Sequence, residues 1–124
     1  MTGYNVKVTN SSKELSARER VAVKDTTNAI PLDEATKTGE VVIDVDYFVE
    51  LAVHNEKSPD KDYKKYVVVS KDGNKYVTGS QSFFTAFTEI FDEMNESGED
   101  YSISVYRVPS KNYKGKEFLT CSIV

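Results

Sequence analysis

The sequence is poor in the residues from which catalytic and disulfide-bonded sites are commonly built. Its 124 residues include no tryptophan, one cysteine and one histidine. Cys121 has no partner for an internal disulfide, and its place in an alternating pattern predicts a small buried side chain. His54 and Cys121 have no metal-ligand spacing, and no glycine-rich phosphate loop is present. We therefore expect no catalytic residues, no metal, no cofactor and no enzyme activity.

Long apolar runs are also missing. No stretch approaches the ~20 apolar residues of a membrane span, and residues 1–8 lack the apolar core of a signal peptide. Together with the unpaired cysteine, this predicts a cytoplasmic protein that has no membrane partner. The length predicts a single domain, residues 1–124, that is large enough to bury a core.

Apolar residues alternate with polar ones over much of the chain. Residues 40–54 carry apolar side chains at every odd position, which favours one long strand over a helix that starts at Asp46. Asp72-Gly73 lies between two β-rich runs, and this is a strong hairpin signal. Shorter alternating stretches that predict the other strands are residues 4–8, 63–70, 74–78, 101–108 and 117–124.

One helix is predicted at about residues 81–97, since Phe83 and Phe87 share a face and Glu89 lies opposite. Ser80 or Ser82 is its expected cap, and Gly98 follows its end. The predicted fold class is therefore α+β and mostly antiparallel. The simplest arrangement is a small OB-like barrel, or a curled sheet, of five to six strands with one packed helix.

Residues 11–39 give weaker signals. Ser11, with Glu14 three residues later, resembles a helix start, but the following residues suit a strand equally. Pro31 bars a regular helix from the next segment, in which residues 32–36 predict at most a turn. The conformation of this part stays open, and we interpret residues 25–39 as a connector within one domain.

Positive charge gathers in two segments of an otherwise acidic chain. The net charge is −4, yet residues 61–79 carry +3 and residues 101–124 carry +3. Residues 80–100, which contain the predicted helix, carry −6. Each basic segment coincides with a predicted hairpin. In both segments, the charged side chains are therefore presented by two strands.

Both basic segments also interleave tyrosines with their cations. Cations neutralise phosphates, and flat rings stack on unpaired bases whatever the base is, which is how single-stranded nucleic acid is held. We expect Tyr113 to be exposed in its loop, and Tyr66 and Tyr76 to be the most buried rings. The candidate nucleic-acid-binding residues are Tyr63, Lys64, Lys65, Lys71, Lys75, Tyr106, Arg107, Lys111, Tyr113, Lys114 and Lys116.

Three stretches carry a resemblance to a known group of proteins: residues 54–58 (HNEKS), 71–80 (KDGNKYVTGS) and 109–124 (PSKNYKGKEFLTCSIV). They resemble small proteins encoded by phages and mobile elements of Gram-positive bacteria, some of which are single-stranded DNA-binding proteins with an OB-like fold. The resemblance spans most of residues 40–124. It implies a cytoplasmic partner of single-stranded DNA. The acidic tail by which cellular single-stranded DNA-binding proteins recruit partners has no counterpart here.

The leading hypothesis is sequence-independent binding of single-stranded DNA during phage or mobile-element replication or recombination, alongside proteins of those processes. The alternative is a non-enzymatic protein-interaction or structural module, in which exposed sheet edges could also make a homo-oligomer. A small enzyme is the third possibility, and it would need an active site of carboxylates and tyrosines. Titration of a fluorescent oligonucleotide separates the first two.

Overall fold

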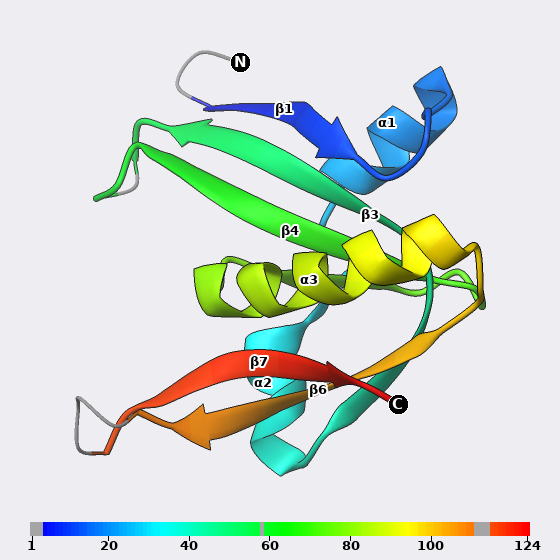
Figure 1. Cartoon of the computed structure of the whole chain (residues 1–124). Coiled ribbons are helices and arrows are strands. Elements are labelled where there is room, and N and C mark those ends of the chain that lie inside the picture. Colours follow the sequence, from blue (N-terminus) through cyan, green and yellow to red (C-terminus); the bar gives the residue numbers. More distant parts are fainter. Residues whose placement is uncertain (1–3, 58, 111–114) are drawn as a thin grey trace. The chain divides into compact units, whose positions relative to one another are not determined.

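The computed structural model describes residues 4–57, 59–110 and 115–124 of the chain. Within them it contains seven strands, mostly antiparallel, three α-helices and one 3-10 helix (Figure 1). The predicted α+β class is therefore confirmed. Two compact units form: the first is Met1–Ile30 with Asp46–Gly79, and the second is Pro31–Val45 with Ser80–Val124. The single domain stays a prediction.

The first unit is built on four strands in the order β1, β3, β4, β5. Their bounds are β1 Tyr4–Ser11, β3 Val41–Asn55, β4 Asp62–Ser70 and β5 Lys75–Thr78, and β3 belongs to this unit from Asp46 onward. β1 runs antiparallel to β3 with Lys7 opposite Ala52. β4 and β5 form the predicted hairpin with Val67 opposite Val77, and Gly73 in its turn has a φ of 93°. A positive φ is the conformation for which glycine is suited.

Strand β3 confirms the long alternating pattern and excludes the helix that the sequence left as an alternative. Successive side chains of a strand point to opposite faces, so its odd positions share one side. Val49 and Leu51 lie there in one buried cluster with Val67 and Val69 of β4. The cluster continues into the segment after β1 through Leu15 and into the first helix through Val23.

The first helix, α1, spans Ala17–Lys24 and settles the segment that the sequence left open. The predicted start at Ser11 is wrong, because Ser11 ends strand β1 opposite Val49 of β3. A second Ser-x-x-Glu box, five residues later, caps the helix instead. The Ser16 hydroxyl accepts from the Glu19 N–H at 3.2 Å, and the Ser16 N–H donates to the Glu19 carboxylate at 3.0 Å.

The second unit is built on the first part of β3, followed along the sheet by β6, Ser102–Pro109, and β7, Glu117–Ile123. Ile43 of β3 lies opposite Ile103, which lies opposite Ile123 of β7. The C-terminal hairpin was predicted with nearly these bounds. The segment after Pro31 forms two short helical turns, α2 Leu32–Ala35 and η1 Thr36–Thr38, after the two-residue strand β2, Ile30–Pro31.

Helix α3, Gln81–Ser97, matches the predicted helix. The Ser80 hydroxyl accepts from the Phe83 N–H, and Gly98 ends the helix in the left-handed conformation at φ 75°. Phe83 and Phe87 are fully buried, and their rings stack with centroids 5.8 Å apart. The helix packs on β7, where the Ser82 hydroxyl donates to the Leu119 carbonyl at 2.7 Å. Its acidic side chains Glu89, Asp92, Glu93 and Glu96 are exposed, as predicted.

Candidate nucleic-acid interface

The first basic segment begins strand β4 and presents cations together with a ring. Tyr63 is half-buried, Lys64 is exposed, and the ammonium of Lys65 lies 6.0 Å from the centroid of the Tyr63 ring. Lys64 also forms an ion pair with Glu50 of β3, with 3.6 Å between Nζ and Oε1. The Lys64 side chain is 57% exposed, whereas the Glu50 side chain is only 15% exposed. The start of β4 therefore offers the Tyr63 ring and the Lys65 ammonium on one face and the Lys64 ammonium on the other.

The two other lysines of this hairpin lie in different surroundings. Lys71 is exposed in the turn beside Asp72, whose carboxylate accepts from the Asn74 N–H at 3.2 Å. Lys75 is half-buried and donates from Nζ to the carbonyls of Ala22, at 2.7 Å, and Asp25, at 2.8 Å. The last carbonyls of a helix have no partners within it, and a cation is favourable at that end. Lys75 therefore caps α1.

Tyr66 was expected to be one of the most buried rings, and this is confirmed. It is 3% exposed in β4 and so offers no face for stacking. Burial raises the pKa of its phenol, as does the nearby Glu50 carboxylate. Tyr76 of β5 is half-buried, like Tyr63. Within the first unit, Tyr63 is thus the candidate ring that accompanies exposed lysines.

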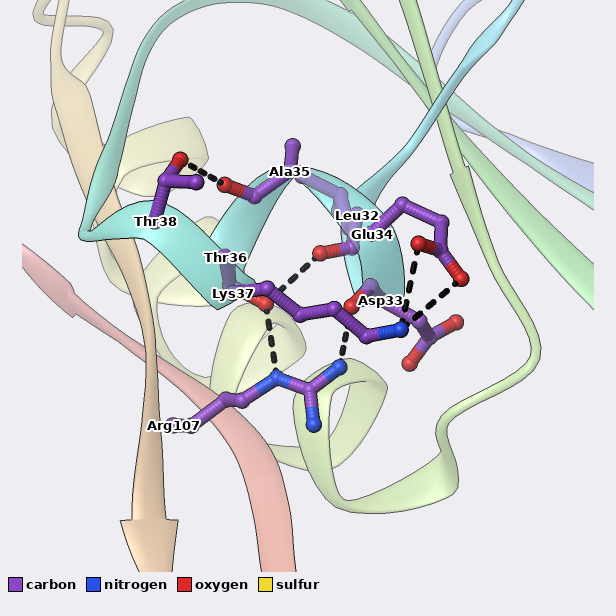
Figure 2. A network of polar contacts seen from close by, with 8 residues as sticks. All are labelled: Leu32, Asp33, Glu34, Ala35, Thr36, Lys37, Thr38 and Arg107. Carbon is purple, nitrogen blue, oxygen red and sulfur yellow. Dashed lines mark hydrogen bonds and ion pairs between the residues drawn. The ribbon is translucent and has the colours of Figure 1, made fainter.

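In the second unit, the Arg107 guanidinium forms hydrogen bonds with other residues of the chain (Figure 2). Its Nε donates to the Thr36 hydroxyl at 3.1 Å, and its Nη2 donates to the carbonyl of Asp33. Thr36 in turn donates to the Leu32 carbonyl at 2.7 Å and is 6% exposed. Arg107 therefore ties the end of β6 to the turns of α2 and η1, although the sequence predicted a phosphate contact.

Tyr106, the neighbour of Arg107, points to the opposite face of the strand because side chains alternate. It is half-buried, and its hydroxyl lies 2.5 Å from the Ser122 hydroxyl. Tyr106 and Arg107 are among the residues that line a hollow of about 540 Å³, and Glu40 and Glu117 also line it. Acidic groups among the lining make this hollow less favourable for a polyanion than the start of β4.

The loop between β6 and β7 was expected to carry the second basic cluster. Lys116 is exposed next to Gly115, and the Ser110 N–H donates to its carbonyl at 2.8 Å. Lys111, Tyr113 and Lys114 lie outside the described residues. Their assignment to a nucleic-acid site stays a prediction, as does the expected exposure of Tyr113.

Next to Tyr63 and Lys64 lies a hollow in the first unit that also includes Lys7 of β1 and His54 of β3. The sequence singled out neither as a nucleic-acid contact. Lys7 lies there because β1 pairs with β3, a contact between residues more than forty positions apart. Alternation within residues 4–8 could have shown that Lys7 faces away from Val6 and Val8, but not which strand lies beside it.

His54 is held between two carboxylates. Its Nδ1 lies 2.7 Å from an Asp62 oxygen, and its Nε2 lies 2.7 Å from a Glu56 oxygen. Both ring nitrogens can donate only in the protonated imidazolium. These hydrogen bonds, first to Asp62 and then to Glu56, raise the pKa of His54 above 6.5. His54 lies at the surface, with 39% of its side chain exposed.

Cys121 is 6% exposed on β7, as predicted for a small core residue. Burial raises the pKa of its thiol to about 12, so a reactive thiolate is disfavoured. Across the described ranges, no three histidine, cysteine, aspartate or glutamate side chains are placed to hold a metal ion. None of the helices described is long and apolar enough to cross a membrane.

Comparison of the chain with protein-family models, with curated proteins and with solved structures gives no match.

Proposed function

We propose that this chain binds single-stranded DNA without sequence preference, in phage or mobile-element replication or recombination. The observation that carries the proposal is the start of β4, where Lys65 lies over the ring of Tyr63 on one face and Lys64 is exposed on the other. Ammonium groups meet phosphates there, and the phenol offers a face to an unpaired base. Lys71 in the adjoining turn extends the positive charge.

The proposal assigns the loop after β6 a supporting role. Its Lys111, Tyr113, Lys114 and Lys116 repeat the mixture of cations and ring seen at the start of β4. Lys75 and Arg107 are assigned to stabilising the fold and not to contacting DNA, because their donors already bind carbonyl and hydroxyl oxygens. Tyr106 contributes one half-buried ring.

A matched pair of variants tests the proposal. Tyr63→Ala removes the ring at the start of β4, and Tyr76→Ala removes a ring of similar exposure on β5. Loss of one stacked base costs about 1–3 kcal/mol. We expect Tyr63→Ala to weaken binding of a fluorescent dT oligonucleotide by roughly 5- to 100-fold, and Tyr76→Ala to weaken it much less. Equal affinities for both variants and the unchanged chain would show that Tyr63 is not part of the interface.

A second candidate function is a protein-interaction module, and strand β7 favours it. Among the described residues β7 pairs with no strand other than β6, and on its other edge the Leu119 carbonyl accepts from the Ser82 hydroxyl of α3. Phe118 and Ile123 on this strand are 42% and 51% exposed. An unpaired strand edge with exposed apolar side chains is a site where another strand can add. Sedimentation of the purified chain would show a concentration-dependent dimer, and Phe118→Lys would abolish it.

A further inference from the structure

The hollow beside Tyr63 has the size and lining of a site for one small ring. Its volume is about 350 Å³, near the lower end of the range for small-ligand pockets. Strands β1, β3 and β4 all contribute to its wall. The lining residues are Asn5, Lys7, Ala52, Val53, His54, Asp62, Tyr63 and Lys64.

Ala52 is the reason why this part of the sheet is hollow. It lies on β3 between Glu50 and His54, which share its face and are both much longer. On the neighbouring strand Lys7 stands directly opposite Ala52. A single methyl group is thus surrounded by long polar side chains, and it forms an apolar floor that a flat ring can cover.

The charges around this floor suit a base with a backbone phosphate on each side of it in the strand. Lys7 comes from β1 and Lys64 from β4, the strands that flank β3. Adjacent strands are about 4.8 Å apart, so the backbones that carry these two lysines are separated by roughly 10 Å. Every base within a nucleic-acid strand has one phosphate before it and one after it. A cation on either side of an apolar floor matches that pattern.

The polar end of the hollow can meet the edge of a base. Asn5 lies opposite His54 in the register of β1 with β3. Its amide offers both a donor and an acceptor, so it can adapt to different base edges. Asp62, which lines the same end, lies 2.7 Å from His54 Nδ1, and Glu56 lies 2.7 Å from His54 Nε2. This lining provides polar contacts without demanding one particular base.

We propose that this pocket receives one unpaired base of a bound strand, with Lys7 and Lys64 contacting the phosphates on its two sides. The inference rests on the proposed function, because it locates a base within the surface assigned to single-stranded DNA. It adds Lys7, Asn5 and Ala52 as contact residues.

Filling the pocket tests this assignment without altering any charge. Ala52→Leu places a larger side chain on the floor, and Ala22→Leu makes the same change on exposed α1 as a control. We expect Ala52→Leu to weaken binding of a fluorescent dT oligonucleotide by roughly 5- to 100-fold, whereas Ala22→Leu leaves it unchanged. Lys7→Gln should reduce the slope of log affinity against log salt by about 0.7.

The nuclear magnetic resonance spectrum of the unchanged chain provides a second readout that does not depend on a variant folding. Addition of the same dT oligonucleotide to ¹⁵N-labelled protein should shift the amide signals of Lys7, Ala52 and Lys64. Binding that leaves these signals in place, or an Ala52→Leu variant that folds and binds normally, overturns the pocket but not the proposed function. Absence of any binding by the unchanged chain at low salt overturns both.

Discussion

Substitution of Lys75 tests most directly which basic side chains stabilise the fold and which bind the oligonucleotide. The Lys75 ammonium donates to two carbonyls at the C-terminal end of α1, those of Ala22 and Asp25, at 2.7 and 2.8 Å. At the same end of the helix the Asp25 N–H donates to the Val21 carbonyl at 3.2 Å. Lys75→Met keeps most of the apolar stem and removes the charge and the donors.

The expected cost follows from these contacts. A cation at a helix C-terminus contributes about 0.3–1 kcal/mol, and a hydrogen bond contributes about 0.5–1.5 kcal/mol net. Because Lys75 is only half-buried, we expect Lys75→Met to lower the free energy of unfolding by about 1–2 kcal/mol. For a chain of this length, that corresponds to a fall in Tm of roughly 3–10 °C.

Thermal unfolding followed by circular dichroism measures this loss, and anisotropy of a labelled dT oligonucleotide measures binding below the transition. Lys64→Met is the matched control, because the Lys64 side chain is 57% exposed and its ammonium lies 3.6 Å from the Glu50 carboxylate. We expect Lys75→Met to lose stability but little affinity, and Lys64→Met to show the reverse. An unchanged Tm for Lys75→Met, with a loss of affinity equal to that of Lys64→Met, would refute this reasoning.

Three further predictions concern buried and titrating groups. Phe87→Ala should destabilise the chain by about 3–5 kcal/mol in urea unfolding, because it removes a fully buried ring that stacks on Phe83. His54 is the only histidine, so its ring signals can be followed in a pH titration, and its pKa should lie above 6.5. Its stabilising contribution should be complete below about pH 6.5 and disappear as the pH rises through the folded pKa; His54→Gln should abolish this dependence. Cys121 should react with a thiol reagent only at the rate of unfolding, since the thiol is buried and its pKa is raised to about 12. Rapid labelling of the native chain at neutral pH would contradict that expectation.

Local patterns in the sequence were sufficient for the longer strands and for α3. The period of two in β3 and the spacing of Phe83 and Phe87 in α3 are read over a few residues. Ser80 and Gly98 marked the ends of α3, because a cap acts on the first or last turn of its own helix. The start of α1 was missed, since Ser11 is held in a strand by its distant neighbour Val49.

The candidate site was less predictable, because side-chain partners are set by contacts between distant parts of the chain. Lys75 binds carbonyls 53 and 50 residues away, and Arg107 binds a hydroxyl 71 residues away. Nothing in the sequence next to Lys75 or Arg107 identifies these distant partners. The same applies to Lys7, which joins the hollow beside Tyr63 only through the pairing of β1 with β3.

The measurement that most directly tests the central proposal is the salt dependence of dT-oligonucleotide binding by the unchanged chain. Anisotropy of a fluorescent oligonucleotide would be followed at a series of potassium chloride concentrations. Binding through ammonium–phosphate contacts predicts that log affinity falls linearly with log salt, with a slope of roughly −0.7 for each phosphate contacted on a single strand. Absence of binding at the lowest salt, or an affinity that salt does not change, would contradict the proposed function.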